Sequence, residues 1–179
     1  DNPAGRTVAI QGAGGVGDPL AGYLADAGAT VVVGDIDPAR AGEVAERVGG
    51  TTLGADEVLA AECDVFAPCA VGGVLNAETI PRLRCRIVAG SANNQLADPG
   101  AADLLHERRI LYAPDYVINA GGATAIVGLE QLGWSRAELD EALSRIGGTL
   151  SEIFAKAEAQ GISSGAAAEA LADERLSAG

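Results

Sequence analysis

The sequence has few aromatic residues and few basic ones. Phe, Trp and Tyr make up 3% of the 179 residues, although 48% belong to the hydrophobic class. The core must therefore be built from Ala, Val, Leu and Ile, which suits helices packed on a parallel sheet. With 12 Lys and Arg against 25 Asp and Glu, the formal net charge is −13. This balance argues against nucleic acid or an anionic membrane as a partner, because both attract basic surfaces.

Histidine, lysine and cysteine are scarce, and each shortage excludes a class of chemistry. His106 is the single histidine, which argues against a histidine-based zinc site and a Ser-His-Asp triad. Cys63, Cys69 and Cys85 are odd in number and lack a CxxC spacing. We therefore expect reduced thiols, with neither a disulfide framework nor a metal site. Lys156 is the single lysine and lies on a charged helical stretch, so a mechanism that needs a buried lysine must obtain it from elsewhere.

Signal-peptide and lipidation motifs are missing from the sequence, as is an apolar run of about 20 residues. We therefore expect a cytoplasmic protein. Its length predicts one domain over residues 1–179, with enough chain to bury a core.

Short β-rich runs alternate with helical runs over the first two thirds of the chain. We expect strands at 6–11, 29–35, 63–68, 85–90 and 110–114, and helices at 16–27, 37–49 and 98–109. The remainder predicts three helices, at 119–133, at 135–161 with a Ser135–Glu138 capping box, and at 163–176. The expected fold class is α/β: a Rossmann-like, doubly wound, mostly parallel sheet with C-terminal helices. Ligands of such sheets bind beyond the carboxyl ends of the strands.

The segment AIQGAGGVGDPL carries three glycines, Gly12, Gly14 and Gly17, between the first expected strand and the first helix. This is the GxGxxG spacing in the context that a dinucleotide-binding turn requires. Gly12 allows the tight turn, Gly14 lets a pyrophosphate approach the backbone, and Gly17 lets helix pack on strand. The free amides of the helix N-terminus then face the phosphates. We expect Asp18, the next residue, to point outward.

The second expected strand ends at Asp35, where a carboxylate would bind both hydroxyls of an adenosine ribose. Because this carboxylate would repel a 2′-phosphate, NAD is predicted in preference to NADP. Arg40 could weaken the preference, but DIDPAR supplies two acids before one base. The alternative is a glycine turn beside an aspartate that only caps a helix. It is disfavoured because the position of the glycines, their spacing and the preceding strand all agree with a dinucleotide-binding turn.

Three further segments lie at expected strand ends: FAPCAVGGVLN (66–76), VAGSANNQL (88–96) and YAPDYVINAGG (112–122). Their glycines and amide side chains suit a ligand cleft. Together with GAGGVG, they closely resemble the leucine, valine and phenylalanine branch of the glutamate/leucine/phenylalanine/valine dehydrogenases. The similarity is to the cofactor-binding half of that family, and it runs from about Arg6 to the last helix.

The resemblance implies NAD-dependent oxidative deamination of an L-amino acid to a 2-oxo acid and ammonia. It also implies the residues of the site. The cofactor-binding positions would be Gly12, Gly14, Gly15, Val16, Gly17, Asp35, Ile36, Arg40, Cys69, Ala70, Ser91, Ala92, Asn93 and Asn119. The substrate would contact Asn93, Ala123 and Ile126. Cys69 is interpreted as a small wall residue and not as a nucleophile, because no histidine partner is evident.

The sequence also departs from the family. There, a separate N-terminal domain supplies a glycine-rich segment, two lysines and an aspartate for substrate binding and acid–base catalysis. Lys156 matches neither lysine, so we expect no catalytic residue and no metal site on this chain, and no turnover by the chain alone. We expect it to be the cofactor domain of a longer, homo-oligomeric enzyme. Two alternatives remain: a stand-alone NAD-binding sensor or regulatory module, and an enzyme whose other domain is a separate polypeptide.

The segment after NAGG bears on the substrate side chain. Leucine-type members usually carry a branched residue at the position of Ala123, and a smaller one leaves volume for a ring. The run NAGGATAIVGLEQLGW is also more similar to phenylalanine dehydrogenases. We therefore favour phenylalanine over a branched aliphatic substrate, although a methyl or two changes selectivity by only about 1–3 kcal/mol. Ordinary helix packing of small residues is the alternative explanation.

Overall fold

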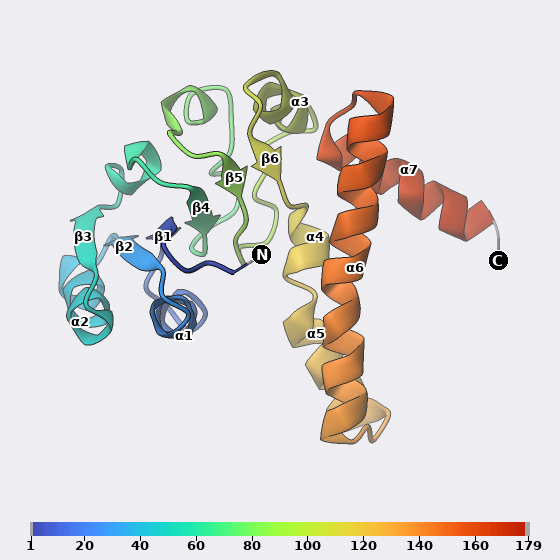
Figure 1. Cartoon of the computed structure of the whole chain (residues 1–179), viewed down its shortest axis with the longest axis horizontal. Coiled ribbons are helices and arrows are strands. Elements are labelled where there is room, and N and C mark those ends of the chain that lie inside the picture. The colour runs from blue at the N-terminus through green and yellow to red at the C-terminus, as the bar shows by residue number, and fades with distance from the viewer. Residues whose placement is uncertain (1, 178–179) are drawn as a thin grey trace.

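A computed structural model describes residues 2–177 and shows a six-stranded parallel sheet with helices around it (Figure 1). The strands are β1 (Thr7–Gln11), β2 (Thr30–Asp35), β3 (Thr51–Gly54), β4 (Val65–Pro68), β5 (Ile87–Val88) and β6 (Leu111–Tyr112). Their order is β3-β2-β1-β4-β5-β6. The chain thus winds outward from β1 in one direction and then from β4 in the other, which confirms the expected doubly wound α/β fold.

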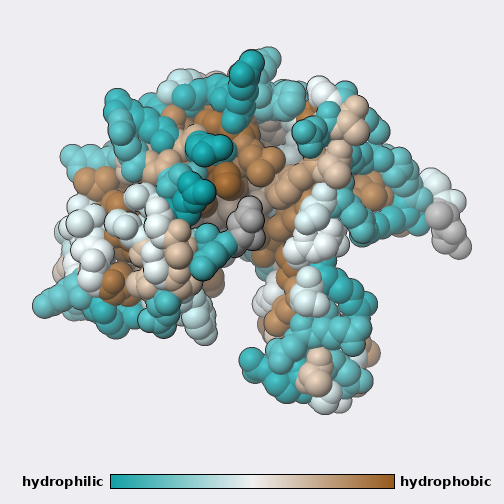
Figure 2. Space-filling view, viewed as in Figure 1, coloured by the Kyte–Doolittle hydropathy of each residue, from teal (hydrophilic) through white to brown (hydrophobic). Residues whose placement is uncertain are grey.

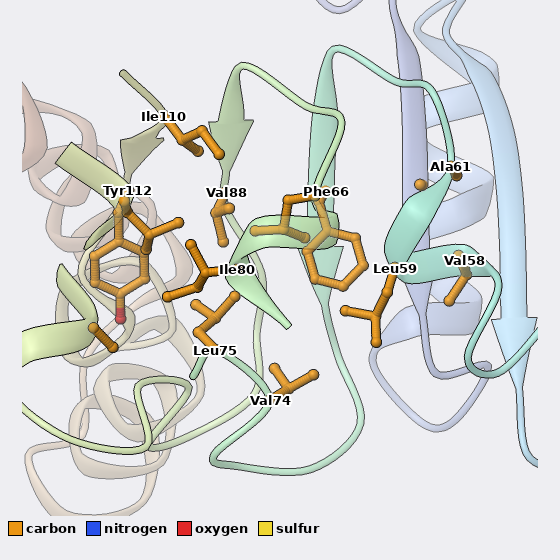
Figure 3. Packing of buried hydrophobic residues seen from close by; sticks show 14 residues of the cluster. Val58, Leu59, Ala61, Phe66, Val74, Leu75, Ile80, Val88, Ile110 and Tyr112 are labelled. Carbon is orange, nitrogen blue, oxygen red and sulfur yellow. The ribbon is translucent and has the colours of Figure 1, made fainter. Parts of the chain in front are cut away.

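The central strands direct alternate side chains to opposite faces of the sheet. Val8 and Ile10 of β1 pack in a core cluster with α1 (Gly17–Asp26) and α2 (Pro38–Val48). Ala9, between them, belongs to the cluster on the other face, which includes residues of α3 (Gly100–Glu107). Phe66, Val88 and Tyr112 are among the buried side chains of that second cluster (Figure 3). Both faces are therefore covered, as a parallel sheet requires.

Helix α2 shows why the strand–helix units form where the sequence predicts them. The Asp37 side chain accepts hydrogen bonds from the amides of Ala39 and Arg40, and Pro38 occupies the first helical turn. At the other end, Gly49 takes a left-handed conformation with φ of 65°. These features are a standard N-cap and a glycine C-cap, so the helix begins and ends where local chemistry dictates.

The C-terminal third is helical. It comprises α4 (Asp115–Ile118), α5 (Gly121–Ile126), a π-helical turn (Val127–Gln131), α6 (Arg136–Gln160) and α7 (Ser164–Ser177). The predicted Ser135–Glu138 capping box begins α6. The segment from α5 through the first half of α6, residues 121–148, is named the helical arm. It projects away from the sheet (Figures 1 and 2) and exposes apolar side chains, including Ile126 and Leu132.

The structure corrects the expected elements in four places. β3 was not predicted, and the strands expected at 85–90 and 110–114 contain only two residues each. The single helix expected over 119–133 begins only at Gly121, as α5, and ends in the π-helical turn Val127–Gln131. There the Gly128 carbonyl accepts a hydrogen bond from the Trp134 amide at 2.8 Å, and the indole ring packs directly on Gly128. The tryptophan therefore folds back on the helix end and prevents a regular continuation.

Two expectations concern the limits of the chain. The predicted domain includes residues 1, 178 and 179, which lie outside the described residues. Within residues 2–177, no helix combines the length and the apolar character needed to cross a membrane.

Candidate functional site

The glycine-rich turn connects β1 to α1 at the carboxyl edge of the sheet. Gly12 has φ of +104°, and a Cβ there would lie 2.9 Å from the Ala70 Cβ. A Cβ on Gly17 would lie 1.9 Å from the Gly12 carbonyl oxygen. Gly14 has open space where a Cβ would be, as does Gly15. The two outer glycines are therefore required by the turn itself, whereas the two middle ones leave the backbone open to a ligand.

Asp35 is held against this turn. Its Oδ2 accepts a hydrogen bond from the Ala13 amide at 2.7 Å, and its Oδ1 accepts one from the Asp37 amide at 2.8 Å. Partial burial raises the pKa of Asp35, but the Ala13 and Asp37 amides and the charge of Arg40 outweigh it, so the pKa lies below its ordinary value. The carboxylate is thus ionised at neutral pH and fixed at the mouth of the glycine turn.

A cavity of about 470 Å³ opens beside the turn. It is lined by residues of the glycine turn, α1 and α2: Ala13, Gly14, Gly15, Asp18, Arg40, Glu43, Val44 and Arg47. Asp18 borders this cavity while its carboxylate pairs with Arg47 of α2 and leaves 46% of its side chain exposed. The expectation that Asp18 points outward is therefore met only in part, because it is directed along the helix surface towards α2.

The remaining residues predicted around the adenosine half lie at the surface. Ile36 is 93% exposed and Val16 is 56% exposed. Arg40 lies 3.9 Å from Asp37 and forms a loose, exposed ion pair with it. Of these side chains, Arg40 is the one whose charge acts on the Asp35 carboxylate.

Cys69 and Ala70 adjoin the glycine turn across the sheet. The Cys69 amide donates to the Gln11 carbonyl at 2.7 Å. The Cys69–Ala70 peptide also packs against Gly12, so these two residues form one side of the space around the glycine turn. The Cys69 thiol is one of three free cysteines.

The loop after β5 carries the next group of predicted residues. Ala92 is buried, and its amide donates to the Pro68 carbonyl at 2.9 Å. The Ser91 hydroxyl is buried without a hydrogen-bond partner among the described residues. Asn93 accepts a hydrogen bond at its Oδ1 from Asn119 Nδ2 at 2.6 Å. Two amides that lie far apart in the sequence are thereby brought together at one edge of the sheet.

Three buried polar residues hold this loop, and the sequence analysis did not identify them. Gln95 is fully buried, and its Nε2 donates to the carbonyls of Gly90 at 2.9 Å and Ala92 at 3.0 Å. Tyr112 donates its hydroxyl to Asp115 Oδ1 at 3.0 Å, and burial raises the pKa of Tyr112, so the hydroxyl remains a donor. The sequence signal was weak: Gln95 stands among other polar residues in SANNQL, and Asp115 follows a proline, so neither is marked as buried.

The predicted substrate residues lie at the start of the helical arm. Ala123 and Ile126 are both exposed and, three positions apart in α5, they occupy one helix face. Lys156 lies elsewhere, in the second half of α6, where its Nζ pairs with Glu174 of α7 at 2.6 Å. The one lysine is therefore engaged in joining two helices.

Other possible ligand sites are separate from this edge. A larger hollow of about 790 Å³ lies between β6, α3 and the end of α6, and none of the predicted site residues lines it. Among residues 2–177, no three His, Cys, Asp or Glu side chains gather as a metal site would require.

Comparison with known proteins identifies the family. The model of the glutamate/leucine/phenylalanine/valine dehydrogenases matches residues 37–178, which is most of the chain. The chain belongs to this family. Leucine dehydrogenase from Geobacillus stearothermophilus is 39% identical over 176 residues, which cover 98% of this chain and 48% of that protein. The chain therefore spans about half the length of the curated relatives it matches.

Solved structures from the same family share the fold. L-tryptophan dehydrogenase from Nostoc punctiforme superposes with a TM-score of 0.95 at 39% identity, covering 99% of this chain and 54% of that one. The hetero-hexameric glutamate dehydrogenase from Thermus thermophilus gives a TM-score of 0.71 at 28% identity, covering 97% of this chain and 46% of that one. The membership of this family inferred from the motifs is thus confirmed, whereas the assignment to its cofactor-binding half stays a prediction.

Proposed function

We propose that this chain is the NAD-binding domain of an L-amino acid dehydrogenase that interconverts an apolar amino acid with its 2-oxo acid and ammonia. The observation that carries the proposal is the coupling of the glycine turn to an ionised Asp35 through the 2.7 Å hydrogen bond from Ala13. In doubly wound sheets, this arrangement receives a pyrophosphate and a ribose diol.

The residues present fit such a cofactor. Gly12 and Gly17 leave no room for a side chain, whereas Gly14 and Gly15 leave the backbone amides accessible. Gln11 and Ser91, at the carboxyl ends of β1 and β5, each hold a buried side-chain oxygen that has no hydrogen-bond partner in the described part of the chain. Unpaired buried polar atoms are costly, so a ligand at this edge would satisfy them.

Each group has a definite role in this proposal. The chemistry that a bound NAD would supply is the acceptance of a hydride from the α-carbon of the amino acid. Asp35 would accept hydrogen bonds from the adenosine ribose, and Cys69 with Ala70 would form the wall of the turn. The Asn93–Asn119 pair would orient the nicotinamide amide and contact the substrate. Because these residues serve the reacting end of the cofactor, they favour a dehydrogenase over a stand-alone sensor.

The proton chemistry requires groups from outside the chain described here. Lys156 is paired with Glu174 and belongs to the α6–α7 interface. We propose that a lysine-bearing domain, in the same polypeptide or another, completes the active site. We further propose that the complete enzyme is a homo-oligomer, which sedimentation of the full-length protein would test.

The substrate is proposed to be an apolar L-amino acid. The matching relatives are named leucine, tryptophan and valine dehydrogenases, so both aromatic and branched side chains occur among them. Ala123 and Ile126 would form part of the side-chain pocket. The small side chain of Ala123 supports phenylalanine over leucine, and kcat/KM for both substrates on the complete enzyme would decide between them.

Titration calorimetry with NAD, NADP and ADP-ribose tests the cofactor assignment on this chain. We expect NAD and ADP-ribose to bind, and NADP to bind at least about tenfold more weakly because its 2′-phosphate meets Asp35. The Asp35→Asn variant should narrow that difference. A folded protein that gives no heat with millimolar NAD would refute the proposal, and equal affinities for NAD and NADP would remove the role of Asp35.

A further inference from the structure

Two cysteines that are distant in the sequence lie side by side where β4 and β5 begin. Cys63 and Cys85 precede the two strands, and both follow a parallel bridge that joins Glu62 to Arg84. The same offset continues into the β4–β5 ladder, so Cys63 and Cys85 are partners in register. This end of the sheet is opposite to the glycine turn and the candidate cofactor site.

Backbone hydrogen bonds bracket the pair. The Cys63 amide donates to the Arg84 carbonyl at 3.4 Å, and the Arg86 amide donates to the Asp64 carbonyl at 3.1 Å. Paired strands lie about 4.7–4.9 Å apart, which is within the range of Cα separations that a disulfide spans. Asp64 forms a bend here, so the ladder is irregular at the point where two sulfur atoms would have to approach.

The two thiols are close enough to influence each other's ionisation. Both are half-buried and pack on the core cluster shown in part in Figure 3. The neighbouring Cys85 thiol, together with burial, raises the pKa of Cys63. The Cys63 thiol lowers the pKa of Cys85 against the effect of burial, and the charge of Arg108 assists. The Cys85 thiol therefore ionises more readily, while the Cys63 thiol retains its proton.

We propose that Cys63 and Cys85 form a redox-active dithiol that closes to an internal disulfide with a low-molecular-weight disulfide of the glutathione class as oxidant. The Cys85 thiolate attacks one sulfur of the oxidant, whose S–S bond breaks and releases one thiolate. Cys63 then loses its proton and attacks the Cys85 sulfur of the mixed disulfide, which releases the second thiol. The two protein thiols are oxidised, and the small disulfide is reduced to two thiols.

Cys69 provides an internal contrast. It lies beyond the other end of β4, against the glycine turn, and it has no cysteine partner within the described residues. A Cys69→Ser variant therefore retains only the proposed pair. Since this test measures thiols and mass, it is independent of cofactor binding and of catalysis.

The experiment oxidises the folded Cys69→Ser protein with glutathione disulfide and follows intact mass and free thiols in denaturant. We expect loss of both thiols and of the mass of two hydrogen atoms, without a glutathione adduct, and full reversal by a reducing agent. The Cys63→Ser, Cys69→Ser variant should accumulate a glutathione adduct on Cys85, because the resolving thiol is missing. The Cys69→Ser, Cys85→Ser variant should react about tenfold more slowly, because less thiolate is available.

Two outcomes would overturn the proposal. One is a Cys69→Ser protein that keeps both thiols under conditions in which the Cys63→Ser, Cys69→Ser variant forms its adduct. The other is a stable adduct on Cys85 that never resolves to an internal disulfide. If a variant fails to fold, peptide mapping of the oxidised wild-type chain decides the question, since a cross-linked Cys63–Cys85 peptide is either present or replaced by other pairings.

Discussion

The two halves of the sheet position their predicted ligand residues in different ways. In the half formed by β1 and β2, strands of five and six residues lead into the glycine turn and Asp35, and backbone hydrogen bonds set their geometry. In the half formed by β5 and β6, strands of two residues lead into loops held by buried side chains such as Gln95 and Asp115. The first half is defined by the local chain, and the second by tertiary contacts.

The largest effect is expected where the first half is most constrained. In the Gly17→Val variant, the new side chain would overlap the Gly12 carbonyl, which lies 1.9 Å from the position of a Cβ. We expect the free energy of unfolding to fall by about 2–3 kcal/mol and NAD binding to be lost. Chemical denaturation and calorimetry measure both quantities.

Gly42→Ala is the matched control, because Gly42 lies within α2 and has open space at its Cβ position. Alanine there should raise the free energy of unfolding by up to about 1 kcal/mol. A Gly17→Val protein as stable as the wild type would show that the turn adapts, and the contrast between the two halves would then fail.

The next effect concerns the second half. Gln95→Leu keeps a side chain of similar size but removes the donors to the Gly90 and Ala92 carbonyls, which costs about 1–3 kcal/mol for a buried unpaired group. If the proposed function holds, NAD affinity should fall about tenfold, because the nicotinamide end depends on this loop. ADP-ribose affinity should change little, because the adenosine half is intact.

The exposed Gln160 at the end of α6 supplies the control variant, Gln160→Leu. It should leave both affinities unchanged. Equal loss of NAD and ADP-ribose binding in Gln95→Leu would indicate a general loss of structure, and the specific role assigned to Gln95 would be wrong.

A smaller effect on the free energy of unfolding is expected at Asp35, and this effect should depend on pH. The pKa of Asp35 is lowered in the folded state, so its stabilising hydrogen bonds are fully present above the unfolded-state pKa of about 4 and are lost as the pH falls through the lower folded value. At pH 7, Asp35→Asn should therefore reduce the free energy of unfolding by about 1–2 kcal/mol.

The difference between wild type and Asp35→Asn should shrink when urea denaturation is repeated near pH 3. Asp26→Asn, at the last residue of α1, is a suitable reference substitution. A gap that stays constant between the two pH values would show that the charge on Asp35 does not contribute to folding.

The smallest effect is expected in the helical arm. Ser135→Ala removes the side chain that accepts the Glu138 amide hydrogen bond, and N-cap replacements of this kind cost about 1 kcal/mol. Asp37→Ala removes the corresponding cap of α2 in the sheet half. Thermal unfolding of both variants would show whether the helical arm unfolds together with the sheet. A separate early transition in Ser135→Ala, but not in Asp37→Ala, would indicate that the arm and the sheet are two cooperative units.

The sequence predicted the features that depend on local rules. Gly12, Gly17, Asp35 and the capping box at Ser135 lie where the spacing indicated. β3 was missed because its four residues are all exposed and lack an alternating pattern, and only pairing with β2 defines it. Gln95 and Asp115 were missed because their roles arise from burial and from partners distant in the chain, neither of which a spacing rule reveals.

The hydrogen bond from Ser164 to β6 has a practical consequence for handling the protein. The Ser164 hydroxyl donates to the Tyr112 carbonyl at 2.6 Å, so the start of α7 contacts β6, the outer strand of the sheet. Removing α7 would expose more of the edge strand β6, to which other chains can pair by strand addition. A truncation after α6 should therefore favour insoluble assemblies during expression, although every residue assigned to the cofactor would still be present.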